Sequence, residues 1–175
     1  LALANYHKIP VIEDAAQAFG SKYKGKLLGT FGAMGTFSFH ETKNIVSGEG
    51  GCLLINEQSL FERAEILREK GTDRSRFNQG LIDKYTWRDI GSSFLPGELI
   101  SAFLYAQLES SSEIMERRTK AWLTYYSEFD ELRDIHHIET SGNYDDVIHN
   151  AHMFYIICKS SDERNHLIKY LAMRE

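Results

Sequence analysis

Three polar residues near the N-terminal end of the sequence have types and spacing that could do chemistry. Asp14 ends the short apolar run IPVIED, Ser38 lies in the run TFSFH, and Lys43 follows that second run. If the two runs are parallel neighbouring strands, their carboxyl ends open on one crevice. One interpretation is a salt bridge between Asp14 and Lys43 at the strand ends. The other is a lysine that traps a carbonyl, with the carboxylate holding the pyridinium nitrogen of a cofactor.

These side chains need a scaffold, and the sequence predicts alternating strands and helices. Short apolar runs predict strands at residues 9–14, 36–40 and 50–56, and the glycine-rich residues 21–32 predict a hairpin. A helix over residues 59–70 is expected to begin after Asn56 as its cap and to stop at Gly71. Residues 72–94 show no clear period, which predicts a long loop of the kind that is usually functional or disordered.

The second half of the chain changes character near residue 113. Helices are expected from Pro96 to about residue 110 and over residues 113–134, where an aromatic stripe of core residues recurs at helical spacing. Two strands, 136–140 and 151–159, precede a last helix that a capping box of Ser160 and Glu163 opens. The pattern is that of an α/β protein, and we place a domain boundary between residues 1–112 and 113–175.

The composition excludes several classes of protein. With 42% hydrophobic and 26% charged residues the chain is of ordinary globular type, and its formal net charge of −5 argues against general binding of nucleic acid. No apolar run approaches the length of a membrane span, and the first residues do not resemble a signal peptide. Cys52 and Cys158 lie in apolar runs, as buried thiols do in a reducing compartment. We therefore expect a cytoplasmic protein without membrane or nucleic-acid partners.

Charge is unevenly spread along this acidic chain. Residues 68–88 hold six basic residues against three acidic ones. Such a loop could meet an anionic small molecule, or it could be an ordinary solvated surface.

Several familiar functional motifs are incomplete or absent in this sequence. Residues 20–27 lack the hydroxyl residue and the helix of a phosphate-binding loop, and GEGG at 48–51 leads into a strand, unlike a dinucleotide fingerprint. No spacing of Cys and His suits zinc, and His136 and His137 would face opposite sides of a strand. There is no nucleophile elbow. The sequence predicts no metal site.

The stretches VIEDAAQAFGS, GTFSFHETKNI and SGEGG, in this order, resemble the DegT/DnrJ/EryC1/StrS family of sugar aminotransferases. The resemblance runs over essentially the whole chain. It implies a pyridoxal-phosphate enzyme of the aspartate aminotransferase fold, fold type I. Residues 1–112 would then be the C-terminal portion of the cofactor-binding large domain, and residues 113–175 the incomplete start of the small α+β domain.

The resemblance also implies roles for single residues. Lys43 would form the Schiff base with pyridoxal 5′-phosphate and move the proton during transamination, which requires a neutral amine at the moment of attack. Asp14 would pair with the pyridine nitrogen, Gln17 would bond the ring's 3-oxygen, and Ser38 would contact the phosphate. The intact Lys43 counts against the related dehydratases, in which a histidine replaces the lysine.

Three further stretches, EKGTDRSRF, DKYTWRDIGSS and NAHMFYI, resemble one branch of this family. That branch transfers an amino group from L-glutamate to dTDP-4-dehydro-6-deoxy-D-glucose, giving dTDP-4-amino-4,6-dideoxy-D-galactose for enterobacterial common antigen. Tyr85, Trp87 and Arg88 would then be loop residues near the nucleotide sugar, although packing within the loop is the simpler interpretation for Trp87. A transaminase acting at C3 of the sugar, or a non-catalytic module that binds a nucleotide sugar, stay as alternatives.

The resemblance implies a homodimer with active sites shared between the subunits. Many family members carry an Asn in a G-Y-N motif that reaches the phosphate of the partner subunit's cofactor. The matching stretch here is Gly91, Ser92 and Ser93, so Ser93 would have to substitute with its hydroxyl. The family's subunit is about twice this long, and we expect residues 1–175 alone to bind the cofactor poorly and to be inactive.

Overall fold

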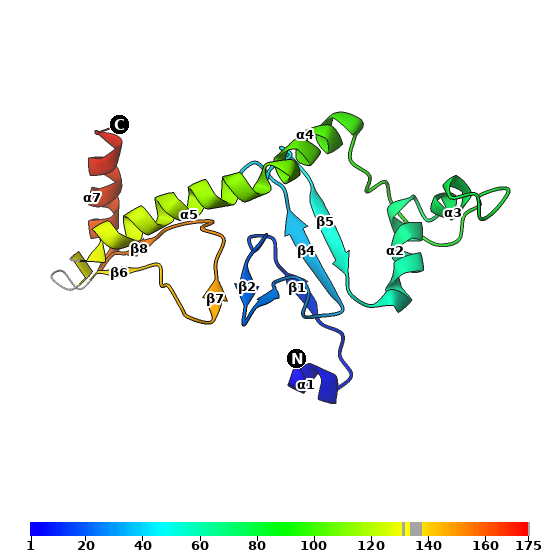
Figure 1. Cartoon of the computed structure of the whole chain (residues 1–175), viewed down its shortest axis with the longest axis horizontal. Helices are drawn as coiled ribbons and strands as arrows, with labels where there is room; N and C mark the ends of the chain where they lie inside the picture. The colour runs from blue at the N-terminus through cyan, green and yellow to red at the C-terminus, as the bar shows by residue number, and fades with distance from the viewer. Residues whose placement is uncertain (131, 134–137, 175) are drawn as a thin grey trace.

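The computed structural model describes residues 1–130, 132–133 and 138–174. Its central sheet has the strand order β1–β4–β5 (Figure 1), with β1 at Ile12–Asp14, β4 at Met34–Ser38 and β5 at Gly51–Ile55. β1 and β4 are parallel, and β4 and β5 are antiparallel. The helix α1, Ala2–Tyr6, precedes this sheet. The three predicted strands are confirmed, and the first two are parallel neighbours, as the site requires.

The predicted hairpin is present and recruits a third strand from far along the chain. β2, Lys22–Tyr23, pairs antiparallel with β3, Lys26–Leu27, through a turn in which Gly25 has a positive φ. β7, Val147–Ile148, pairs with the other edge of β2. This pairing joins residues on the two sides of the boundary expected at 112/113, which falls in the first turns of α5. The division into two domains stays a prediction.

The segment after β5 forms one 3-10 turn and two short α-helices. η1 spans Gln58–Leu60, α2 spans Phe61–Arg68, and α3, Arg74–Asn78, lies in the predicted long loop. The expected cap is wrong. The Asn56 side chain instead donates to the carbonyl oxygens of Gly29 and Gly32 at 3.1 and 2.9 Å, because this residue follows directly on β5 and faces the loop before β4. Gly71 ends the α2 segment as expected, with φ at +76°.

The remaining helices are α4, Glu98–Glu109, α5, Ser111–Glu128, and α7, Ser161–Ala172. α5 runs from the central sheet to the far end of the molecule, where α7 stands (Figure 1). The two-stranded sheet β6, Glu139–Thr140, and β8, Ile156–Ile157, lies beneath that end. Ser160 caps α7 by accepting from the Glu163 amide at 3.1 Å, as predicted, and the Glu163 carboxylate accepts from the Lys159 amide at 2.6 Å rather than from that of Ser160. His136 and His137 lie outside the described residues.

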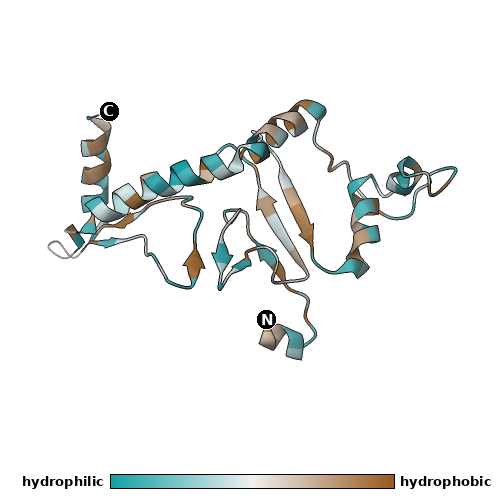
Figure 2. Ribbon diagram, in the orientation of Figure 1, coloured by the Kyte–Doolittle hydropathy of each residue, from teal (hydrophilic) through white to brown (hydrophobic). Residues whose placement is uncertain are grey.

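The aromatic stripe of α5 packs around the buried Trp122 as expected, but Tyr125 in the same stripe is 57% exposed. Trp122 is 4% exposed, stacks on Tyr126 with ring centroids 5.0 Å apart and meets Phe154 edge-on at 5.6 Å. Its indole N–H donates to the Met153 carbonyl at 3.1 Å. A second small core of Ala15, Ala33, Phe39 and Ile45 surrounds the central sheet. Figure 2 shows hydrophobic residues on β4, β5 and α4. Within the described ranges, no helix has the length and apolar character needed to span a bilayer.

Candidate active site

The parallel pairing of β1 and β4 brings two of the predicted site residues to one edge of the sheet. Asp14 is the last residue of β1 and lies opposite Thr36, two residues before β4 ends at Ser38. The chain then makes a turn in which the Lys43 amide donates to the His40 carbonyl at 2.9 Å. Since β1 and β4 run in the same direction, their carboxyl ends lie at the same edge of the sheet, and the loop that carries Lys43 begins there.

Asp14 and its neighbour Glu13 face different surroundings, as successive residues of a strand do. The Glu13 carboxylate accepts hydrogen bonds from the backbone amides of Gly29 at 2.9 Å, Gly32 at 2.8 Å and Phe31. Asp14 is exposed, and from the described residues its carboxylate accepts only the Ala16 amide proton, at 3.2 Å. The carboxylate of Asp14 therefore keeps most of its acceptor capacity for a ligand, while that of Glu13 is used to hold the loop before β4.

The structure contains no ion pair between Asp14 and Lys43, both of which lie in the described part of the chain. The Lys43 ammonium likewise forms no hydrogen bond to any described residue, although the side chain is half-buried. The salt-bridge interpretation of these two residues thus fails. A carboxylate and an amine at one sheet edge that do not neutralise each other are available to a third group.

Ser38 also keeps a free donor. Its oxygen accepts from the His40 amide at 3.3 Å, so its hydroxyl proton can be donated elsewhere. The side chain of Gln17 is exposed, and its backbone carbonyl is bonded by Asn150 at 2.7 Å. Pyridoxal phosphate offers a ring nitrogen, an aldehyde and a phosphate. The free carboxylate, amine and hydroxyl at this edge fit those three groups chemically.

A network of polar side chains behind this edge was not anticipated from the sequence. Asn44, next to Lys43, donates to the Asn150 carbonyl at 2.6 Å, and its oxygen lies 2.9 Å from Nδ1 of His152. Asn150 in turn donates to the carbonyls of Gln17 and Phe19 at 2.7 and 3.0 Å. The only sequence signal was the polar pair Asn150 and His152 at the start of an apolar strand-like run.

Two histidines of this region have pKa values below the ordinary range. Burial lowers the pKa of His149, whose ring packs 4.2 Å from that of Trp122. Burial also lowers the pKa of His152, and the positive charges of Lys43 and Arg118 add to the effect. Both imidazoles are therefore held neutral near pH 7.

The predicted loop residues form a separate cluster. Asp73, 4% exposed, accepts from the Thr86 amide at 2.7 Å and from the Arg88 guanidinium, and these hydrogen bonds lower the pKa of its carboxyl. Tyr85 packs on Phe77, with ring centroids 5.6 Å apart. Trp87 is 83% exposed. Ser93 forms a bridge to Glu69 beside the end of α2. Among the described residues, no hydrogen bond joins these side chains to the sheet edge of Asp14 and Lys43.

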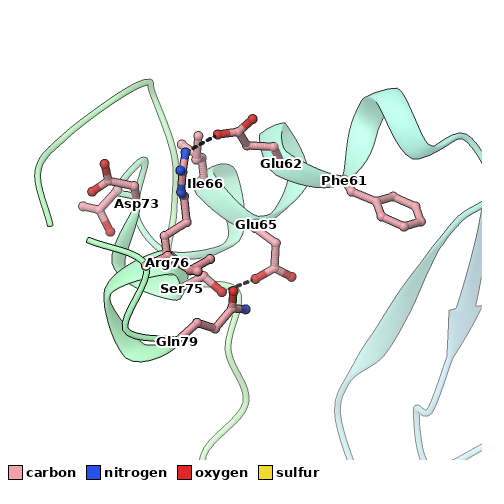
Figure 3. A pocket seen from close by; sticks show the side chains of 10 residues that line it. Phe61, Glu62, Glu65, Ile66, Asp73, Ser75, Arg76 and Gln79 are labelled. Atoms are coloured by element: carbon pink, nitrogen blue, oxygen red, sulfur yellow. Dashed lines mark hydrogen bonds and ion pairs between the residues drawn. The ribbon is translucent and has the colours of Figure 1, made fainter. Parts of the chain in front are cut away.

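Neighbouring carboxylates neutralise half of the basic residues of this segment. Figure 3 shows a hollow between α2 and α3 in which Arg76 pairs with Glu62 at 3.0 Å and Ser75 bonds Glu65 at 2.5 Å. Arg68 pairs with Glu65 as well, and Arg88 with Asp73. Three of the six basic residues are thus engaged within the chain. Among the described residues, no cluster of His, Cys, Asp and Glu could hold a metal ion.

The model of the DegT/DnrJ/EryC1/StrS aminotransferase family matches residues 1–175. The chain belongs to this family. It is 36% identical over 172 residues to GDP-perosamine synthase of Escherichia coli O157:H7, which covers 97% of this chain and 43% of the relative. It is 33% identical over 138 residues to dTDP-4-dehydro-2,6-dideoxy-D-glucose 3-dehydratase of Saccharopolyspora spinosa, a match that covers 69% of this chain and 30% of the relative.

A solved structure shows the same fold in this family. The crystal structure of DesV from S. venezuelae, in complex with a ketimine intermediate, matches with a TM-score of 0.80 and 28% identity, over 97% of this chain and 43% of that one. The predicted fold type I of pyridoxal-phosphate enzymes is confirmed. This chain spans less than half the length of the curated relatives that it matches.

Proposed function

We propose that these residues form the lysine-bearing part of a pyridoxal-phosphate aminotransferase that acts on a nucleotide sugar. The observation that carries the proposal is the pair of free groups at one sheet edge, the Asp14 carboxylate and the Lys43 amine, which form no ion pair with each other. A lysine without a partner is what a carbonyl-trapping residue requires. Membership of the aminotransferase family supports the same conclusion.

The chain's own residues would divide the work at the cofactor. When bound, pyridoxal phosphate supplies an aldehyde that condenses with amines and a ring that accepts electrons. Lys43 would hold the cofactor through its Nζ, with loss of water from the aldehyde, and once released that amine would carry the proton that transamination moves. The Asp14 carboxylate keeps the ring nitrogen protonated by accepting its hydrogen bond. Ser38 donates to the phosphate, and Gln17 donates to the 3-oxygen of the ring.

For the substrates, we propose L-glutamate as amino donor and dTDP-4-dehydro-6-deoxy-D-glucose as acceptor, giving dTDP-4-amino-4,6-dideoxy-D-galactose. The similarity of residues 69–77, 83–93 and 150–156 to that branch of the family supports this choice. Transfer to C3 of a related sugar is the alternative within the same fold, and NMR of the product separates the two. A non-catalytic sugar-binding module would have no use for a lysine that forms no ion pair with Asp14 at the same sheet edge.

We propose a homodimer in which the loop of residues 72–94 serves the partner subunit's site. This loop and the start of α4 expose large apolar side chains, with Ile90 at 87% and Leu99 at 88% exposure. A second subunit packed against these apolar side chains would remove them from water. Ser93, Tyr85, Trp87 and Arg88, which lie apart from the chain's own sheet edge, would then reach the cofactor phosphate and the nucleotide sugar of the other subunit.

The deciding experiment uses the full-length protein, meaning the complete open reading frame that contains residues 1–175. Borohydride reduction after loading with pyridoxal phosphate should place the label on the peptide carrying Lys43, and incubation with L-glutamate and the 4-keto sugar nucleotide should give the amino sugar. Lys43→Ala should abolish both results, whereas Lys22→Ala, a lysine of the β2 hairpin, should change neither. Labelling elsewhere, or transamination by Lys43→Ala, would refute the proposal. The 175-residue chain alone should show no cofactor absorbance.

A further inference from the structure

A segment more than a hundred residues away along the chain holds both parts of the candidate cofactor site. Asn150 is 6% exposed, and its amide group donates to the carbonyls of Gln17 and Phe19 at 2.7 and 3.0 Å. These two carbonyls belong to the turn that follows Asp14. Both protons of the Asn150 amide are used in this way, so the side chain fixes the backbone of residues 17–19 at two points.

The same segment also fixes the residue after Lys43. The amide nitrogen of Asn44, a side chain 7% exposed, donates to the backbone carbonyl of Asn150 at 2.6 Å. The oxygen of that amide must therefore face Nδ1 of His152, 2.9 Å away, and the imidazole must carry its proton on Nδ1 to donate. His152 is held in turn from α5, where Arg118 donates to its carbonyl at 2.8 Å.

The backbone between Asn150 and His152 adopts a conformation that its residue disfavours. Ala151 has φ at +51° and is buried, and its amide donates to Nδ1 of His149 at 3.1 Å. A residue with a Cβ adopts this left-handed conformation only where its surroundings enforce it. The bend turns Asn150 toward residues 17–19 and His152 toward Asn44, so one strained residue directs two side chains to two different loops.

We propose that Asn150 and His152 are positioning residues that set the distance between the Asp14 turn and Lys43, an inference that rests on the proposed function. A carboxylate for the ring nitrogen and a lysine for the aldehyde must stand at opposite ends of one flat molecule. The two loops that carry them are joined through residues 150–152, because Asn150 bonds one loop and the Asn44–His152 pair bonds the other. Removing either bond leaves a buried polar group without its partner and leaves the loop after its strand held by the β1–β4 pairing alone at that point.

The test compares isosteric variants in the full-length protein. Asn150→Asp keeps the shape but can no longer donate, and His152→Leu removes the donor to Asn44. His152→Asn keeps an N–H donor near the position of Nδ1 and should restore the parent behaviour. Asn143 is an exposed residue of the same connection whose side chain donates no hydrogen bond to the described part of the chain, so Asn143→Asp is the matched control.

The first measurement is hydrogen exchange of peptides covering residues 14–21 and 40–47, which needs no cofactor. We expect Asn150→Asp to speed exchange about tenfold or more in the first peptide, and His152→Leu to do so in the second, with no change for the control. The second is the single-turnover rate with L-glutamate after loading with pyridoxal phosphate. The limiting single-turnover rate should fall about 10- to 100-fold in both variants, since misplacement slows chemistry more than binding. The L-glutamate concentration that gives half of this rate should change little.

The outcomes separate this inference from the proposed function. Parent-like exchange and turnover in Asn150→Asp, with Lys43 still labelled by borohydride, would overturn the positioning role and leave the aminotransferase intact. Loss of activity in His152→Leu that His152→Asn fails to restore would overturn the role of the Asn44–His152 bond. Failure to label Lys43 in the parent would instead overturn the proposed function. If a variant does not fold, shown by loss of the parent's thermal transition, the other variant decides the same question.

Discussion

Glu13 and Asp14 are neighbours in β1, yet the carboxylate of Glu13 accepts three backbone amides from residues 29–32 while that of Asp14 accepts one from Ala16. The first carboxylate holds the loop that leads into β4. The second is left for a ligand. Because successive side chains of a strand point to opposite faces, β1 gives Glu13 a structural role and leaves the Asp14 carboxylate for ligand binding.

This division predicts opposite effects of two matched substitutions. Glu13→Gln should lower the free energy of unfolding by about 2 kcal/mol or more, because an amide accepts the three N–H groups less strongly and turns its own NH₂ toward one of them. Asp14→Asn should leave stability within about 0.5 kcal/mol while abolishing cofactor absorbance. Urea unfolding and visible absorbance of the full-length protein measure the two effects. Equal loss of stability in both variants would contradict the division.

Much of the strand framework could be predicted because it depends on local patterns. The runs ending in Asp14 and Ser38 are short, apolar and bounded by turns, and the capping box at Ser160 is contiguous in sequence. The contacts of Asn150 and His152 depend on groups more than a hundred residues away, and no local pattern encodes such partners. Asn56 illustrates the same limit. Its type suits a helix cap, but the carbonyls of Gly29 and Gly32 compete successfully for its side chain.

The half-buried His149 predicts a loss of folding stability in mild acid. Its folded pKa lies below the ordinary 6.5 because burial disfavours the charged form. The unfolded chain therefore binds protons first, so the stabilisation is complete above pH 6.5 and declines as the pH falls toward the folded value. Thermal unfolding between pH 7.5 and 5.5 should show a smaller decline in His149→Phe than in the parent. A decline in His149→Phe as large as that of the parent would contradict this assignment.

The carboxylate of Asp73 predicts a further loss of folding stability at lower pH. The Thr86 amide and the Arg88 guanidinium lower the pKa of this carboxyl from its ordinary 3.8, so its stabilising effect is present above 3.8 and is lost as the pH falls through the folded value. The parent should be more stable than Asp73→Asn at pH 5, and this difference should narrow toward pH 3. Urea unfolding at the two pH values measures it. A constant difference would mean that the hydrogen bonds of Asp73 do not depend on its charge.

Two glycines with the same backbone conformation predict how tightly the loop of residues 72–94 is joined to α2. Gly71 and Gly25 have φ at +76° and +78°, so alanine costs roughly 1–2 kcal/mol of conformational strain at either site. A Cβ at Gly25 meets nothing within 4 Å, whereas at Gly71 it would lie 1.9 Å from the Asp89 carbonyl oxygen. Gly71→Ala must therefore displace the backbone that also bonds Arg88 and Asp89 to the Gly71 carbonyl.

We expect Gly25→Ala to lower the free energy of unfolding by roughly 1 kcal/mol and to leave turnover unchanged, because only local strain is added. Gly71→Ala should cost several times more and should speed hydrogen exchange across residues 85–93, where the proposed substrate-facing residues lie. If that loop serves the partner subunit, mixing Gly71→Ala with Lys43→Ala should give a dimer with one fully intact site. Such mixed dimers should recover up to about half the turnover of the parent per site pair, whereas activity that never exceeds either variant alone would rule out a shared site.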